Sequence, residues 1–255
     1  MIHAVTLTIA DAIAEITLNR PEKLNAVTPD MAAAIQNYCV VVDSDDAVRV
    51  VLLKGAGDRA FSTGSDLNSL AEYPSAWKFR NRVEYATAVR NIRKPVVAAL
   101  KGWVLGGGCE MALSADIRVA GTSMRCGFPE VKRGWVGGGG ASQMLPRLIG
   151  YGQAMRLLVT GDAIDAQEAQ RLGLIELLVE DAEVDARAQS LCREIAGYSP
   201  VAVQAVKASV RMALTSSLEA GLRYENEMNT LCFSAGDHLE GIHAFQQKRP
   251  AEFKR

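Results

Sequence analysis

The chain has 255 residues, a hydrophobic content of 49% and a formal net charge of −1. This length allows one large domain or two smaller ones, with a substantial buried core. The near-neutral charge gives no electrostatic indication of a nucleic-acid or membrane partner, and we expect neither.

The first part of the chain alternates predicted strands and helices. Polar and apolar residues alternate over 5–9, which predicts a half-buried strand that pairs with 12–18 through a turn at 10–11. Thr28 followed by Pro29 is typical of a helix start, with a hydroxyl cap before a proline that needs no N–H partner. Short apolar runs typical of fully buried strands occupy residues 48–53, 95–100 and 116–120. Strands separated by helices indicate the α/β class.

The last part of the chain is predicted to be mainly helical. Asp165 begins a variant of the capping box, and that helix is expected to stop at Gly173. Ser199 caps the next predicted helix. Two more helices are predicted over 217–233 and 238–248.

We find no linker, no repeat and no low-complexity tract, so one domain is the economical interpretation. Within it, residues 1–198 would form the core with the site, and residues 199–255 a helical extension for oligomerisation. The first helix of this extension carries an apolar stripe of Ala205, Val206, Val210 and Leu214.

Cysteine usage and the N-terminal pattern bear on the compartment. The five cysteines are dispersed, without CxxC or metal-ligand spacing, which favours free thiols in a reducing compartment. The first 18 residues lack the regions of a signal peptide, and no apolar run is long enough for a membrane span. We therefore expect a cytoplasmic protein without a metal site.

Two glycine-containing loops are the first candidates for chemistry. VLGGGCEMA (104–112) places three glycines between a predicted strand and a helix, and AFSTGSDL (60–67) follows an earlier strand in the same way. Neither loop fits the P-loop or the dinucleotide fingerprint. A helix N-terminus offers free N–H groups, and glycine lets a ligand oxygen approach the backbone. One N–H from each loop could polarise the same carbonyl oxygen.

Two glutamates lie close to these loops in the sequence. Glu110 falls in the first turn of the helix after the three glycines, and Glu130 follows the next strand. Together they could activate a water molecule and donate a proton. Each also has a simpler interpretation, because a glutamate in a first helical turn often only complements the helix dipole. The three histidines lie outside these loops and no GxSxG occurs, which argues against a hydrolase triad.

Six motifs in the same order resemble the enoyl-CoA hydratase/isomerase (crotonase) superfamily nearly end to end. The segments that carry the resemblance are NRPEKLNAVT, AFSTGSDL, GWVLGGGCEMALSADIRVA, FPEVKRGWVGGGGASQMLPRLIG, EAQRLGLIELLV and HAFQQKRPAEFK. The resemblance implies an α/β fold, a crotonase-like spiral of ββα turns with a helical C-terminal trimerisation region. It also implies an acyl-CoA substrate, a homotrimer or hexamer, and no cofactor apart from the coenzyme A of the substrate.

Carried over residue by residue, the resemblance puts the oxyanion hole at the N–H groups of Ser65 and Gly107. Glu110 and Glu130 match the two acid/base glutamates of the hydratases. Substrate-binding residues are expected at Lys23, Leu24, Ala26, Gly64, Asp66, Leu67, Gly106, Trp135 and Gly138. The sequence departs from the family at Ser65, where alanine is usual, and at Gly137, where proline is usual.

Hydration of a 2-enoyl-CoA is the activity that this resemblance favours. Isomerisation, hydrolysis or decarboxylation of an acyl-CoA on the same scaffold remain alternatives, as does a CoA- or RNA-binding protein without catalysis. The preferred acyl chain is expected to depend on residues 67–92, which hold four aromatic residues: Tyr73, Trp77, Phe79 and Tyr85.

Overall fold

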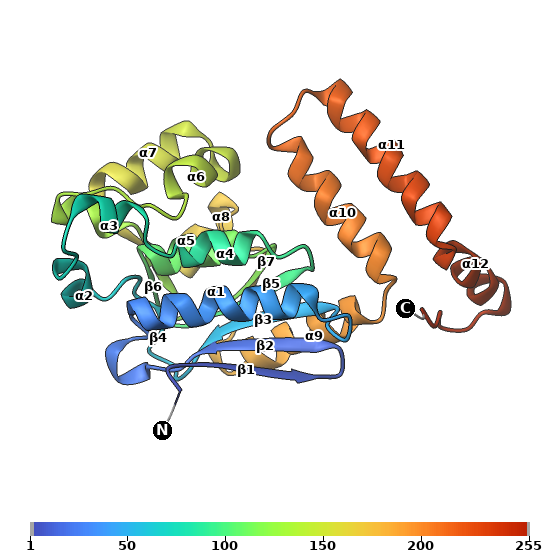
Figure 1. The fold of residues 1–255 in the computed structure, drawn as a ribbon, viewed down its shortest axis with the longest axis horizontal. Coiled ribbons are helices and arrows are strands. Elements are labelled where there is room, and N and C mark those ends of the chain that lie inside the picture. The colour runs from blue at the N-terminus through green and yellow to red at the C-terminus, as the bar shows by residue number, and fades with distance from the viewer. Residues whose placement is uncertain (1–2, 254–255) are drawn as a thin grey trace.

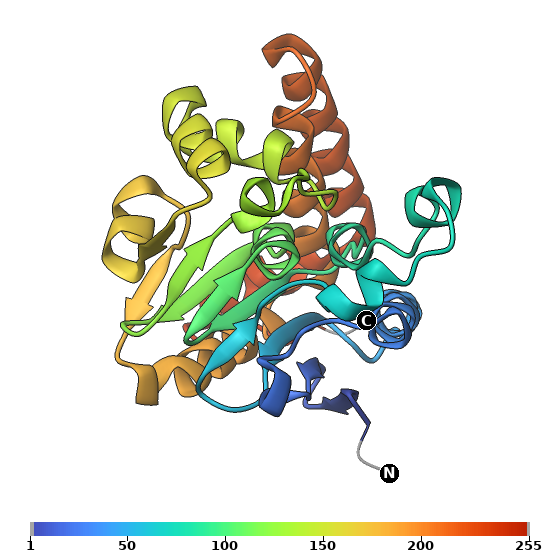
Figure 2. The same ribbon diagram turned by 90° about the vertical axis from the view of Figure 1, so that its left-hand side faces the viewer.

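The computed structural model describes residues 3–253 and contains two β-sheets (Figures 1 and 2). The larger sheet has the order β1 (Val5–Ala10), β2 (Ile13–Leu18), β3 (Val50–Gly55), β5 (Val96–Leu100), β7 (Ile117–Gly121) and β10 (Leu177–Val179). The smaller has the order β4 (Ala60–Ser62), β6 (Trp103–Leu105), β8 (Arg125–Gly127) and β9 (Ala163–Asp165). Only the β1–β2 and β8–β9 pairs are antiparallel.

Successive segments of the chain repeat one ββα arrangement. Each turn adds one strand to the larger sheet and the next strand to the smaller sheet, and then forms helices. After β3 and β4 come α2 (Leu67–Ala71), α3 (Ala76–Arg80) and α4 (Tyr85–Arg90); after β5 and β6 comes α5 (Gly107–Ser114). After β7 and β8 come α6 (Ala141–Ile149) and α7 (Tyr151–Thr160). This spiral confirms the predicted α/β class.

The central strands β3, β5 and β7 of the larger sheet are mostly buried on both faces, as their apolar runs predict. In β3, Val51 and Leu53 belong to the main core, together with residues of α1 (Pro29–Ser44), α4 and α5. Val50 and Leu52 point to the other face and pack under α9 (Val184–Ala196). Alternate residues of one strand thus serve two cores, which explains a run without polar positions.

The predicted helix caps are confirmed. Thr28 accepts a hydrogen bond from the Met31 N–H at 3.3 Å at the start of α1. Asp165 does the same at the start of α8 (Ala166–Leu172), which ends at a left-handed Gly173. The first hairpin differs slightly from the prediction, because its turn lies at Asp11 and Ala12 rather than at 10–11. Both residues have positive φ, which matches the twist of a two-residue hairpin.

The C-terminal helices are α10 (Pro200–Ala213), α11 (Leu218–Ala235) and α12 (Asp237–Gln247), and Figure 1 shows α10 and α11 standing side by side away from the sheets. Buried Lys207 fixes α10 to the core, since its Nζ donates to the Lys94 carbonyl at 2.7 Å and to Asp116 at 2.5 Å. Only part of the predicted apolar stripe faces this core: Ala205 is buried, whereas Val206, Val210 and Leu214 are 63%, 62% and 51% exposed. The division of the chain at residue 199 stays a prediction.

No helix within residues 3–253 is both long and apolar enough to cross a membrane.

Candidate active site

The loop before α1 lies against the loop that follows β4. The Val27 N–H donates to the Gly64 carbonyl at 2.8 Å, and the Asp66 N–H donates back to the Val27 carbonyl at 2.9 Å. Asn25, fully buried and with positive φ, holds the two loops together because its amide donates to the Ala60 carbonyl at 2.9 Å. Five of the expected site residues therefore lie on these two adjacent loops: Leu24, Ala26, Gly64, Ser65 and Asp66.

The start of α5 meets this pair of loops. A Cβ atom on Gly64 would lie only 2.8 Å from the Gly107 nitrogen, so the two backbones touch. Within residues 3–253 the N–H groups of Ser65 and Gly107 have no hydrogen-bond acceptor. Two unused donors side by side, one of them at a helix N-terminus, form a site suited to a carbonyl oxygen.

The glycines at the start of α5 lie in close contact with side chains of other segments. Gly106 has a φ of +55°, and a Cβ there would meet Glu130 Oε1 at 2.8 Å. A Cβ on Gly107 would lie 2.0 Å from the hydroxyl of Tyr85. A side chain at either position would therefore displace Glu130 or Tyr85, and at Gly106 the positive φ would add backbone strain.

Glu110 is buried on α5, with 3% of its surface exposed. Its Oε1 accepts a hydrogen bond from the Ala141 N–H at 3.1 Å, at the N-terminus of α6. The glycine-rich loop encloses the carboxylate, since a Cβ on Gly137 or on Gly139 would lie 2.6 or 2.8 Å from one of its oxygens. The carboxyl group of Glu110 thus accepts a backbone hydrogen bond at the N-terminus of a helix.

Glu130 has a different environment, in the short 3₁₀ helix Pro129–Arg133. Its Oε2 is buried and has no hydrogen-bond partner within the described residues. Burial raises the pKa of this carboxyl above its usual value, and the charge of nearby Glu110 raises it further. The two glutamates are therefore close enough to interact, and they differ in that Glu110 accepts a backbone hydrogen bond whereas Glu130 Oε2 has no partner among the described residues.

Two ion pairs that the sequence did not reveal support these loops. Arg20 binds Asp66 at 2.6 Å, while Asp66 also caps α2. Arg82 pairs with Glu84 at 3.2 Å, and its guanidinium lies where a Cβ of Gly138 would be. Burial raises the pKa of Glu84, with the charge of Glu110 contributing. Arg20 and Asp66 lie far apart in the sequence, so no local pattern predicts their contact, whereas Arg82 and Glu84 are only two positions apart.

The other expected residues lie at the surface. Lys23 and Leu67 are exposed, and neither side chain forms a hydrogen bond or ion pair with the other site residues in the part of the chain described. Trp135 is 42% exposed, and its backbone N–H donates to the Glu130 carbonyl at 3.3 Å.

The aromatic residues of the segment 67–92 divide into two groups. Tyr73 and Tyr85 line a cavity together with Ser65 and residues at the start of α1. Trp77 does not line it and is 65% exposed, and neither does Phe79, whose ring packs edge-on against Tyr73. The dependence of acyl preference on this segment stays a prediction.

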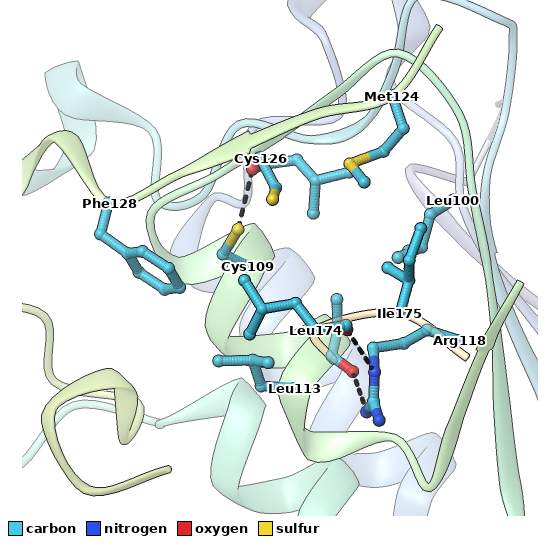
Figure 3. A pocket seen from close by; sticks show the side chains of 11 residues that line it. Leu100, Cys109, Leu113, Arg118, Met124, Cys126, Phe128, Leu174 and Ile175 are labelled. Carbon is cyan, nitrogen blue, oxygen red and sulfur yellow. Dashed lines mark hydrogen bonds between the residues drawn. The ribbon is translucent and has the colours of Figure 1, made fainter. Parts of the chain in front are cut away.

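A second cavity is lined by residues of α5 and of the strands β5 to β8 (Figure 3). Apolar side chains and the sulfur atoms of Cys109 and Cys126 line it, and Arg118 closes one end by donating to the Leu174 carbonyl at 2.9 Å. Its volume of about 20 Å³ suffices for about one water molecule and not for an acyl chain. Among residues 3–253, no cluster of three or more histidine, cysteine or acidic residues could hold a metal ion.

Comparison with known proteins gives likenesses over nearly the whole chain. Residues 8–255 match the enoyl-CoA hydratase/isomerase family. The short-chain-enoyl-CoA hydratase of Clostridium acetobutylicum is 35% identical over 94% of this chain and 93% of its own. The (E)-benzylidenesuccinyl-CoA hydratase of Thauera aromatica is 34% identical over 98% of each chain. The crystal structure of an enoyl-CoA hydratase from Bacillus anthracis covers 99% of both chains, with a TM-score of 0.92 at 32% identity.

Proposed function

The chain belongs to the enoyl-CoA hydratase/isomerase family, and from this premise we propose that it hydrates 2-enoyl-CoA thioesters to 3-hydroxyacyl-CoA. The observation that carries the proposal is the pairing of two glutamates in opposite environments with two free N–H groups. No cofactor is needed beyond the coenzyme A of the substrate.

In the proposed reaction the thioester oxygen accepts hydrogen bonds from the N–H groups of Ser65 and Gly107. This withdraws electrons from the conjugated double bond and makes the β-carbon electrophilic. Ionised Glu110 takes a proton from water as the water oxygen attacks the β-carbon. Protonated Glu130 gives its proton to the α-carbon, and the proton on Glu110 must reach Glu130 before the next turnover.

Glutamine variants of the two glutamates test this proposal. We expect Glu110→Gln and Glu130→Gln each to lower kcat for crotonyl-CoA by about 10²–10⁴-fold. Binding of the saturated butyryl-CoA, measured by calorimetry, should change little, because glutamine keeps the shape of the side chain. The matched control is Glu183→Gln, a change at an exposed glutamate outside the site.

Product analysis distinguishes hydration from the other reactions of the family. A 3-hydroxyacyl-CoA supports the proposal, whereas a shifted double bond or free CoA would contradict it. Full hydration by Glu130→Gln would also contradict it, because a single glutamate would then suffice. A panel of enoyl-CoAs of graded length and branching would identify the preferred acyl chain.

We also propose that the protein is a trimer or hexamer built through α10–α12, and that it is cytoplasmic. The support for oligomerisation is the row of exposed apolar side chains on these helices: Val206, Val210, Leu214, Leu218, Leu222, Leu231, Phe233, Leu239, Ile242 and Phe245. The five free cysteines, four of them buried, support a reducing compartment.

Light scattering tests the assembly. We expect three or six times the mass of one chain, and Val210→Asp should lower that mass. Val40→Asp is the matched control, since Val40 on α1 is 63% exposed and Val210 is 62% exposed. An active wild-type monomer would contradict the proposed assembly.

A further inference from the structure

The hydroxyl of Tyr85 lies at the point where the two oxyanion loops meet. Tyr85 is the first residue of α4, and only 5% of its surface is exposed. Its Oη lies 3.1 Å from Ser65 Oγ, and a Cβ on Gly107 would lie only 2.0 Å from it. The hydroxyl therefore touches both residues whose N–H groups form the proposed oxyanion hole.

The hydroxyls of Ser65 and Tyr85 carry two protons, and the hydrogen bond between them takes up only one. Ser65 and Tyr85 share a single hydrogen bond, in which either oxygen can be the donor. The second proton has no acceptor in the part of the chain that the structure describes. A buried tyrosine hydroxyl normally finds a partner, and an unused buried donor costs about 1–3 kcal/mol.

We propose that Tyr85 donates this proton to the thioester oxygen as a third oxyanion donor, with Ser65 Oγ donating to Tyr85 and orienting it. The inference rests on the proposed function, because it assigns a further catalytic residue to the same site. Tyr85 contacts the substrate oxygen, whereas the Ser65 side chain acts through Tyr85 as a positioning residue.

The surroundings of Tyr85 suit a donor that never releases its proton. Burial raises the pKa of its hydroxyl, and the charges of Glu84 and Glu110 raise it further, although the Ser65 hydrogen bond acts in the opposite direction. The phenol stays neutral at physiological pH, so it stabilises the developing negative charge through a hydrogen bond and leaves proton transfer to the two glutamates.

Hydration kinetics of Tyr85→Phe, Ser65→Ala and the double variant test the proposal. Tyr85→Phe should lower kcat for crotonyl-CoA by about 10²-fold, as loss of one oxyanion donor does elsewhere. Butyryl-CoA should bind nearly as tightly as before. Ser65→Ala keeps the phenol and should lose about 10-fold or less, and the double variant should match Tyr85→Phe because the serine acts through the tyrosine.

Tyr198→Phe is the matched control, since its hydroxyl also has one hydrogen-bond partner, Glu194 at 3.1 Å, on the surface. It should leave kcat unchanged. Wild-type kcat in Tyr85→Phe, or losses that multiply in the double variant, would overturn the proposal.

A second readout separates this inference from the proposed function. Acetoacetyl-CoA forms an enolate whose absorbance can be followed against pH on the protein, whatever reaction the site catalyses. Loss of an oxyanion donor should raise the pKa of the bound ligand by about one unit or more. If the wild type fails to hydrate enoyl-CoAs but Tyr85→Phe shows this shift, the hydratase proposal fails and the donor proposal stands. If hydration occurs and the shift is absent, the reverse holds.

Discussion

Adding one methyl group at Gly139 should displace the carboxyl group of Glu110, the proposed base. A Cβ at this position would lie 2.8 Å from Glu110 Oε2, 3.0 Å from Glu110 Cβ and 2.9 Å from the Cβ of Ala86. Ordinary contacts between carbon atoms are about 3.5–4.0 Å, so these groups must separate by about 0.5 Å or more. Ala86 lies on α4 and Glu110 on α5, and both backbones are packed in the main core, so neither neighbour can move freely.

The expected magnitudes follow from this overlap. Overpacking of this kind costs about 1–3 kcal/mol of stability. A misplacement approaching 1 Å at a catalytic group lowers the rate by up to about 10²-fold. We therefore expect Gly139→Ala to fold, to melt several degrees below the wild type, and to lose about 10-fold to 10²-fold in kcat for crotonyl-CoA.

Gly152→Ala is the matched control for this experiment. Gly152 lies in α7, and a Cβ there would meet no atom within 4 Å. The same methyl group should therefore raise stability by about 0.4–1 kcal/mol and leave kcat unchanged. The enoyl absorbance gives kcat, and thermal denaturation gives stability. Wild-type kcat in Gly139→Ala, or an equal loss in Gly152→Ala, would refute the reasoning from packing.

Three further predictions concern charge and specificity. Burial raises the pKa of Glu130 in the folded chain. Between the unfolded pKa of about 4.3 and the higher pKa of the folded state, the folded chain therefore binds more protons, and stability falls as the pH rises through this range. Glu130→Gln should not show this loss, so its melting temperature relative to that of the wild type should rise from pH 4 to pH 8. A difference in melting temperature that stays constant over this range would contradict the prediction. Lys207→Met should lower the free energy of unfolding in urea by about 3 kcal/mol, because it leaves half-buried Asp116 without its closest cation; an unchanged value would show that the ion pair is not needed. Tyr73→Ala should change the dependence of kcat/KM on acyl length while exposed Trp77→Ala does not, and a uniform effect of Tyr73→Ala on all lengths would point to a purely structural role.

Local signals in the sequence predict the helices and the larger sheet well. The caps at Thr28, Asp165 and Ser199 each mark a helix start, because capping is a contact between residues three apart. The apolar runs identify the buried strands for a similar reason, since both faces of the sheet are covered. The smaller sheet gives no such signal, because each of its strands has only three residues and no period can be read from three.

Contacts between segments are where prediction from the sequence stops. The sequence predicts α10 as a helix with an apolar stripe, and the helix is confirmed. The pattern alone cannot show whether such a stripe packs on the core or stays exposed. Buried Lys207 lies beside exposed Val206 on that helix, against the expectation from residue type alone. The contact of Tyr85 with Ser65 joins residues 20 positions apart, and only the folded chain brings them together.

The two glutamates and the two glycine loops hold one another in a reciprocal arrangement. Glu130, which follows β8, packs against Gly106 in the loop before α5, and Glu110 on α5 packs against Gly137 in the loop after Glu130. Each carboxylate is therefore positioned by the segment that carries the other one. Glycine at 137 leaves the room that Glu110 Oε1 occupies. A change in either loop must then disturb both carboxyl groups together, which is why we expect variants of the two segments to combine non-additively.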